Sequence, residues 1–546
     1  MRIIRSRRPR VLLGAAAAVL AVGAGALTAA GAADASSTTA STAISTSEAS
    51  PVVATDKGAV RGLSADGTSS FRGVPYAAAP TGNLRWRPPQ PAAGWYGVRD
   101  ATSYGASCPQ APSVVAPPSA ALSEDCLFLN VTTPALHPVV KKPVLVWIHG
   151  GGLTGDSGSN YDGTKLAKAG AVVVTVNYRL GALGFLAHPA LESGGAAGNY
   201  GLMDQQAALR WVQRNIGRFG GDPHNVTIAG ESAGGLSVLA HVTSRSSKGL
   251  FQRAIVESGA FALEQEPLAK AEAFGKEFAT KVGCADQSAD CLRKAPVQTL
   301  VDNISTATAL IPGVVDGAVL KESIGTALAA GRFNHVTILN GSNHDEEALF
   351  TLGGRVVSRG YNVAYTSPVT ADNYQSNIAS ALRITPTQAA AIAADYPLSA
   401  YPTPDKAFGT LIGDATFACG VDQVNTWTAR HVPTYGYEFN DDTAPFLFAP
   451  AGLVDVATHG SEMWYLFDLP NAPFPVPLNA EQTKLADTMR AAWVKFAATG
   501  SPSTAAVHWP SYGKVLSLEL PAAQVSTDFA ARHHCATFAQ NLDKVK

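Results

Sequence analysis

Short apolar runs alternate along most of the chain with longer amphipathic stretches, and this alternation limits the fold more than any other feature of the sequence. Six such runs lie at residues 144–148, 171–176, 226–229, 254–256, 336–339 and 435–439. Continuous apolarity is typical of strands that are covered on both faces. Between the second and third runs, apolar residues from Leu202 to Ile216 recur at helical spacing, which indicates a crossover helix between parallel strands. The sequence therefore predicts an α/β fold with a mostly parallel central sheet, helices on both faces and long insertions.

After the first 50 residues, neither an internal repeat nor a break in composition divides the 546-residue chain. Residues 51–546 are therefore expected to form a single domain. The formal net charge is −1, and lysine and arginine form no run beyond the first ten residues. A nucleic-acid partner is not expected, because such proteins carry a basic surface.

The first 33 residues are typical of a secretory signal peptide. Arginines precede an apolar stretch at residues 11–30, and small residues surround a cleavage site expected near Ala32 or Ala33. An uncleaved membrane anchor is the alternative, although Ala and Gly, which make up much of the stretch, are weak membrane formers. Residues 34–50 are rich in Ser, Thr and Ala and are expected to be a flexible lead-in. We expect a secreted protein with no stable membrane association after cleavage, exported by the general or the twin-arginine route.

Six cysteines in an exported chain favour disulfides, with fifteen possible connectivities. The local candidates are Cys108 with Cys126 and Cys284 with Cys291, which leaves Cys419 to pair with Cys535. Buried free thiols are the alternative.

The motif GESAG at residues 230–234 directly follows the apolar run 226–229. A strand that turns sharply into a helix leaves no room for a β-carbon on either side of the turn, and such a turn lifts a hydroxyl out of the sheet. Ser232 is therefore a candidate nucleophile. The motif HGGG at residues 149–152 follows the run 144–148, and its glycines can bring backbone amides close to a substrate carbonyl. A plain loop is the alternative for these glycines.

A serine nucleophile needs a base, an acid that orients the base, and donors for the oxyanion. Acidic residues follow the run 336–339, where active-site groups of open α/β sheets gather, although a solvated acidic turn would look the same. They are Asp345, Glu346 and Glu347. The chain order serine, acid, histidine leaves several candidate bases. They are His431, His459, His508, His533 and His534.

Among these histidines, His459 is best placed, because it lies in a short polar loop. His533 and His534 lie beside Cys535, but no further ligands occur at zinc-like spacing. We therefore expect neither a metal site nor a cofactor.

Two long motifs resemble the type B carboxylesterase and cholinesterase family. One is EDCLFLNV at residues 124–131, and the other runs from GNYGLMDQ at 198–205 through NVT at 225–227 to GESAGG at 230–235. The resemblance extends from about Pro51 to the carboxyl end. It implies an α/β-hydrolase fold and a carboxylesterase, that is, a serine hydrolase of carboxylic esters. The resemblance also supports the three cysteine pairs proposed above.

Carried over by position, the resemblance implies a catalytic triad of Ser232, Glu346 and His459. The oxyanion hole corresponds to the backbone amides of Gly151, Gly152 and Ala233. The chain departs from the family after the acid, where Glu347 replaces the usual glycine.

A second departure concerns the loop at residues 109–125, which holds a tryptophan in cholinesterases and no aromatic residue here. A choline-specific role is disfavoured, because the ring that would attract the quaternary ammonium is missing. We expect small-molecule esters with apolar groups as substrates. An interfacial lipase is the main alternative, and a non-catalytic binding or adhesion protein of the same fold is the other.

Overall fold

The computed structural model describes residues 50–112, 121–192, 197–304, 313–351, 355–358, 361–446, 456–472 and 476–542. The expected signal peptide and, apart from Ser50, the expected lead-in lie outside the described residues. Residues Ala49–Lys546 group into one compact unit. Among the helices of the described part, none combines the length and the apolarity that a membrane span requires.

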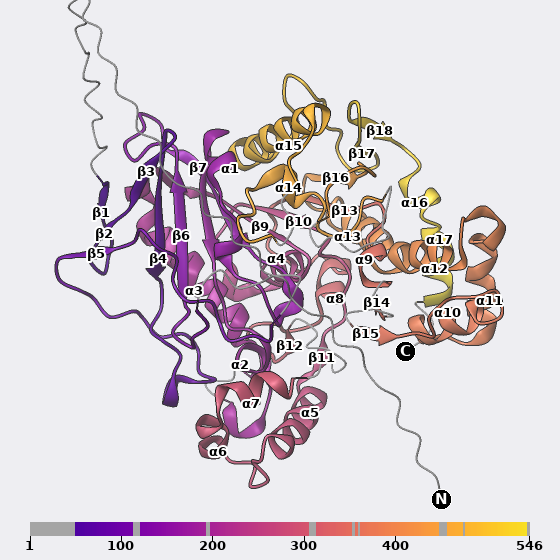
Figure 1. The fold of residues 1–546 in the computed structure, drawn as a ribbon, viewed down its shortest axis with the longest axis horizontal. Helices are drawn as coiled ribbons and strands as arrows, with labels where there is room; N and C mark the ends of the chain where they lie inside the picture. The colour runs from indigo at the N-terminus through magenta and orange to yellow at the C-terminus, as the bar shows by residue number, and fades with distance from the viewer. Residues whose placement is uncertain are drawn as a thin grey trace, which may run out of the picture. The chain divides into compact units, whose positions relative to one another are not determined.

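A sheet of 11 strands runs through this unit (Figure 1). In spatial order its strands are β18 (Gln524–Ser526), β17 (Val515–Leu518), β16 (Thr434–Phe439), β13 (Thr337–Asn343), β10 (Arg253–Glu257), β9 (Gly221–Glu231), β7 (Lys142–Ile148), β8 (Val172–Val176), β6 (Phe128–Thr133), β4 (Thr68–Pro75) and β3 (Leu63–Ala65). All neighbours from β17 to β8 pair in parallel, whereas β18, β6, β4 and β3 pair antiparallel. The predicted mostly parallel sheet is confirmed, and each of the six apolar runs lies in one of its parallel strands, to within one residue at the start of the run.

Smaller sheets flank the large one. They comprise β1 (Val52–Ala54), β2 (Ala59–Arg61) and β5 (Val98–Asp100); β11 (Glu266–Pro267) and β12 (Val314–Val315); and β14 (Arg355–Ser358) and β15 (Tyr361–Ala364).

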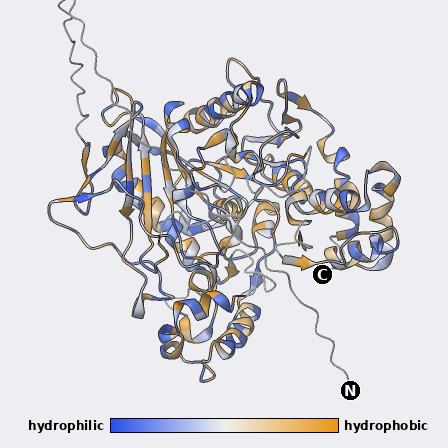
Figure 2. Ribbon diagram, in the orientation of Figure 1, coloured by the Kyte–Doolittle hydropathy of each residue, from blue (hydrophilic) through white to orange (hydrophobic). Residues whose placement is uncertain are grey.

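Helices cover both faces of the large sheet. The helices before residue 330 are α1 (Thr164–Lys168), α2 (Gly181–Phe185), α3 (Tyr200–Asn215), α4 (Ala233–Thr243), α5 (Leu268–Lys281), α6 (Ala289–Lys294), α7 (Val297–Asp302) and α8 (Ile324–Ala329). The helices after residue 330 are α9 (Ala348–Thr351), α10 (Tyr374–Leu382), α11 (Pro386–Asp395), α12 (Pro404–Gly413), α13 (Cys419–Thr428), α14 (Met463–Leu466), α15 (Ala480–Thr499), α16 (Phe529–Arg532) and α17 (Cys535–Leu542). Figure 2 shows that many of these helices alternate between hydrophilic and hydrophobic residues, as expected of helices with one buried side.

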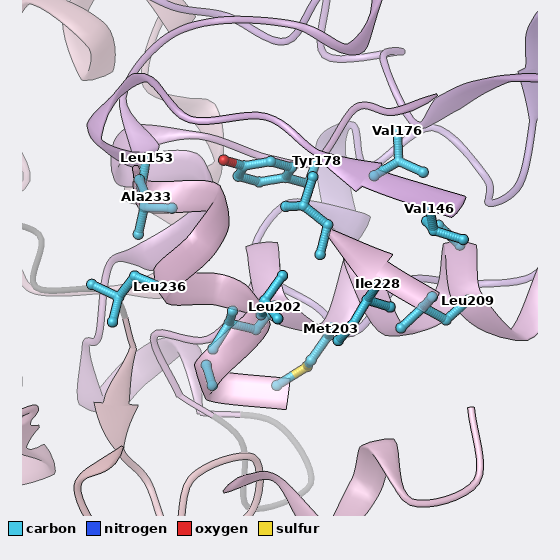
Figure 3. Packing of buried hydrophobic residues seen from close by; sticks show 14 of the residues in the cluster. Val146, Leu153, Val176, Tyr178, Leu202, Met203, Leu209, Ile228, Ala233 and Leu236 are labelled. Carbon is cyan, nitrogen blue, oxygen red and sulfur yellow. The ribbon is translucent and has the colours of Figure 1, made fainter. Parts of the chain in front are cut away.

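Alternation along β7 explains why the sheet is buried on both faces. Successive side chains of a strand point to opposite sides. Val146 joins the core formed with α3 and α4, whereas Trp147 joins the core formed with α14 and α15. Figure 3 shows the first of these cores, where Val146 and Ile228 of the sheet lie among Leu202 and other residues of α3. The expected crossover helix between β8 and β9 is therefore α3.

All three expected cysteine pairs are disulfide-bonded: Cys108 with Cys126, Cys284 with Cys291, and Cys419 with Cys535. The third bond attaches α17 to α13 across a separation of 116 residues. It therefore ties the carboxyl-terminal segment to the body of the fold.

A buried ion-pair network lies beside this third disulfide. His533 donates from Nδ1 to Asp414 Oδ1 at 2.6 Å and from Nε2 to Glu438 Oε1 at 2.8 Å. Burial lowers the pKa of His533, but the two carboxylates outweigh burial and raise it from 6.5 to about 10. His533 is therefore a cation at neutral pH, held between two anions.

We predict that H533Q destabilises the protein in a pH-dependent way, because a neutral amide removes the cation that Asp414 and Glu438 share and leaves Glu438 with Arg532 alone. Near pH 6 the free energy of unfolding should fall by about 3 kcal/mol, which is typical of a broken buried ion pair. The folded-state pKa of His533 lies above its unfolded value, so its contribution is complete below pH 6.5 and is lost as the pH rises through about 10. Urea unfolding of both proteins near pH 6 and near pH 10.5 measures the difference, which should shrink at the higher pH.

The control is H508Q, because His508 is exposed and should contribute little at either pH. An H533Q effect of equal size at both pH values would contradict a charge-based explanation.

Candidate active site

Ser232 lies in the turn between β9 and α4, at the carboxyl edge of the sheet. Its φ of 57° and ψ of −125° are strained for a residue with a β-carbon. A β-carbon at Gly230 would lie 2.6 Å from the carbonyl oxygen of Ile148, and one at Gly234 would collide with the same atom. The glycines of the motif are therefore needed for the close approach of α4 to β7. The turn leaves Ser232 partly exposed, as the sequence predicted for a nucleophile.

The triple-glycine loop lies directly beside Ser232. A β-carbon at Gly150 would lie 3.1 Å from the β-carbon of Ser232. Gly151 and Gly152 follow with φ values of 77° and 62°, in the left-handed region that favours glycine. The amides of Gly151 and Gly152 start a short 3-10 helix and that of Ala233 starts α4, and the first amides of a helix lack partners within it. The three expected oxyanion donors thus belong to two neighbouring helix starts.

Tyr178 fixes the strand end that carries this loop. Its hydroxyl donates to the carbonyl oxygen of His149 at 2.8 Å, and its ring stacks on the His149 ring at 4.4 Å. Both side chains are buried. Tyr178 therefore fixes the start of the loop through a hydrogen bond and a ring contact, both with His149.

Glu346 and His459 meet although they are 113 residues apart in the chain. His459 donates from Nδ1 to Glu346 Oε2 at 2.5 Å. Glu346 Oε1 accepts from the Ser258 hydroxyl at 2.5 Å and from the backbone N–H of Asn343 at 2.8 Å. Glu346 is thus held in place on both of its oxygens, and it is the candidate acid that binds His459.

The second ring nitrogen of His459 lies next to Glu231, the residue before Ser232. His459 Nε2 lies 3.1 Å from Glu231 Oε1, and in the described residues no hydrogen bond joins His459 to the Ser232 hydroxyl. Catalytic hydrogen bonds often form only when substrate is bound. The structure therefore brings the acid and the base together and places the base next to the serine turn.

The other candidate residues lie elsewhere. Asp345 contacts Lys406 and His344, and His533 belongs to the carboxyl-terminal network described above. His431 stacks on His335. Among the described residues, no group of three or more His, Cys, Asp or Glu side chains is arranged to hold a metal ion.

Further buried carboxylic acids belong to this region, and sequence reasoning gave them no role: the charges of Glu231 and Glu462 act on His459, and Glu257 lies within reach of Glu231. Glu231, Glu257 and Glu462 are all buried. Burial raises the pKa of Glu231 to about 7 and that of Glu257 to about 8, and it also raises the pKa of Glu462. Burial lowers the pKa of His459, but Glu231 and Glu346 outweigh it and raise the pKa to about 10. Charged Glu231 thus favours the imidazolium, which cannot act as a base, whereas protonation of Glu231 favours the neutral imidazole.

Ser258 and two phenylalanines were also missed. Ser258 directly follows β10 at the same sheet edge as Ser232, which is the only signal in the sequence that could have identified it. The rings of Phe350 and Phe417 lie 5.1 Å and 5.2 Å from the ring of His459. The imidazole is thus flanked by apolar rings as well as by carboxylates.

Comparison with known proteins gives consistent matches. A family model described as the carboxylesterase family matches residues 49–537. The chain is 35% identical to the fumonisin B1 esterase of Sphingopyxis macrogoltabida, over 84% of each chain. It is 34% identical to the para-nitrobenzyl esterase of Bacillus subtilis, over 84% of this chain and 92% of the relative.

One solved structure, of a PNB esterase, superposes with a TM-score of 0.75. It is 30% identical, and the match covers 88% of this chain and 98% of that one. The α/β-hydrolase fold and the predicted family resemblance are confirmed.

We predict that E231Q lowers the pKa of His459, because the substitution removes a carboxylate that stabilises the imidazolium. The shift should be on the order of one pH unit, as for loss of a close opposite charge. An NMR titration of ¹³C-histidine-labelled protein, with the His459 signal assigned by its loss in H459Q, measures the change.

The matched control is E277Q, on the exposed surface of α5. An unchanged or raised pKa of His459 in E231Q would show that Glu231 does not carry the negative charge next to the imidazole.

Proposed function

This chain belongs to the carboxylesterase family, and from that premise we propose that it hydrolyses carboxylic esters through an acyl-enzyme formed on Ser232. In its neutral form, His459 accepts the proton of the Ser232 hydroxyl as the hydroxyl oxygen attacks the ester carbonyl. The imidazolium then donates this proton to the departing alcohol. A water molecule then attacks the acyl group. His459 takes a proton from this water and returns it to the Ser232 oxygen as the acid is released. The observation that carries the proposal is the 2.5 Å contact of His459 with Glu346 beside the strained Ser232 turn.

In this mechanism Glu346 orients the imidazole and stabilises its positive charge. The carboxylate can do so because Ser258 and Asn343 bind its other oxygen and prevent it from rotating. The amides of Gly151, Gly152 and Ala233 would receive the negative charge of the tetrahedral intermediate. Their position at glycine-permitted turns next to Ser232 supports this role.

We further propose that the substrates are esters with apolar groups. Phe350 and Phe417 flank His459, and the ester that Ser232 attacks must lie next to this imidazole, so its acyl and alcohol groups lie close to the two rings. The loop between Cys108 and Cys126 carries no aromatic ring that could bind a quaternary ammonium. Because one relative is named for para-nitrobenzyl esters, aromatic esters are suitable probes.

Secretion is also part of the proposal. The arginine-rich, apolar first 33 residues support an export signal. The three disulfides add support, because disulfides persist in oxidising compartments.

We predict that S232A abolishes covalent turnover. The rate constant kcat on a soluble nitrophenyl ester should fall by about four orders of magnitude or more, because the nucleophile is lost and only binding and the oxyanion donors remain. A phosphonate that phosphonylates active serines should label the wild type once per chain and S232A not at all. S511A, at an exposed serine, serves as the control and should behave as the wild type. Full activity of S232A would disprove the assignment of the nucleophile.

A second prediction separates an esterase from an interfacial lipase. With nitrophenyl esters of increasing acyl length, we expect smooth saturation on soluble short-chain esters. Rates are measured on both sides of each ester's solubility limit. A sharp rise in rate above that limit would instead favour the lipase.

A further inference from the structure

A π-helical turn (Asp414–Ala418) separates α12 from α13. Such turns are rare, and they often occur at functional sites because the extra residue redirects a side chain. Here the turn carries Phe417, which is buried. The Phe417 ring lies 5.2 Å from the His459 ring and 5.5 Å from the Phe261 ring. The turn therefore supplies one wall of the space around the imidazole.

The carboxyl-terminal segment holds this turn at both ends. At the start of the turn, Asp414 Oδ1 accepts from His533 at 2.6 Å. Directly after the turn, Cys419 is bonded to Cys535. Residues 533–535 are thus bonded to the chain on either side of Phe417, through His533 and Cys535. In addition, α17 contacts the π-helical turn.

The same segment is anchored on the central sheet. His533 also donates to Glu438, in β16, at 2.8 Å, and the other oxygen of Glu438 accepts from Arg532 at 2.7 Å. Glu438 is fully buried and Asp414 nearly so. His533 therefore connects a rigid strand to the π-helical turn, and its side chain is fixed on both ring nitrogens.

We propose that His533 and the Cys419–Cys535 disulfide are positioning residues for the substrate pocket. They hold the π-helical turn so that Phe417 packs against His459, and they thereby set the selectivity of the enzyme among acyl groups. The proposal rests on the proposed function, because it takes His459 as the base. None of these carboxyl-terminal groups touches the reacting atoms.

Loss of His533 or of the Cys419–Cys535 disulfide should widen the pocket, because Phe417 would no longer be held against the imidazole. Bulky acyl groups would then gain relative to acetate. The effect must appear in the ratio of kcat/KM values for two esters, since a general loss of stability lowers both values alike.

The test is a double-mutant cycle between His533 and Phe417. The ratio of kcat/KM for nitrophenyl benzoate to that for nitrophenyl acetate is measured in wild type, H533Q, F417A and the double variant, near pH 7.5 and at a temperature where all four are folded. We expect F417A to change the ratio by about 10-fold or more, the size of a pocket contact in specificity. H533Q should change it by at least about three-fold in the same direction.

In the F417A background, H533Q should leave the ratio unchanged within about two-fold, because residues that act through one contact are not additive. An unchanged ratio in H533Q, or the same change in both backgrounds, would overturn the proposal.

The disulfide supplies an independent arm with a matched control. C419S/C535S should change the ratio in the direction of F417A, whereas C284S/C291S, which removes a bond near α5 and α6, should not. Equal ratios in the two disulfide variants would count against the proposal. If C419S/C535S fails to fold, D414N replaces it, because that substitution removes the anion that holds His533 to the turn.

Phosphonate labelling of Ser232 in each protein separates this proposal from the proposed function. Absence of labelling in the wild type would reject the acyl-enzyme mechanism itself. Normal labelling with unchanged kcat/KM ratios would reject only the positioning role of His533 and the disulfide.

Discussion

Everything in the site depends on parallel strands ending at one edge of the sheet. The triple-glycine loop follows β7, Ser232 follows β9, Ser258 follows β10, and Glu346 comes shortly after β13. Because these four strands are neighbours and run in the same direction, their carboxyl ends bring groups from distant parts of the chain together. Only His459 comes from outside this set, from the loop before α14. Its hydrogen bond to Glu346 ties that loop to the edge.

The strained backbone of Ser232 is stabilised by hydrogen bonds to its neighbours. The left-handed conformation of Ser232 is unfavourable by itself, on the order of 1–3 kcal/mol. Its N–H donates to the carbonyl oxygen of Glu257, and its carbonyl oxygen accepts from Leu236 in α4. The strained residue is thus fixed between a neighbouring strand and the first turn of a helix. The strained backbone keeps the Ser232 hydroxyl exposed, whereas an unstrained turn would let the side chain turn toward the protein.

The parts predicted from sequence are those with a local physical cause. The parallel strands were found because burial on both faces leaves continuous apolar runs, and Ser232 because a sharp strand-to-helix turn requires glycines. Its short polar loop favoured His459 among the five histidines, but family resemblance was needed to assign it as the base and to choose Glu346 from three adjacent acids, because no local pattern distinguishes those acids. Ser258 and Phe417 were missed because a serine after a strand is commonplace, and because a π-helical turn depends on tertiary contacts made by the far end of the chain.

That far end has a consequence for how the protein matures. Ribosomes deliver residues 532–535 after Ser232, Glu346 and His459, and domains assemble as their segments emerge. A growing chain therefore carries the three candidate catalytic residues before the segment that contacts the π-helical turn has been made. Under the proposed positioning role, a chain that still lacks residues 532–535 would not yet have the selectivity of the folded enzyme.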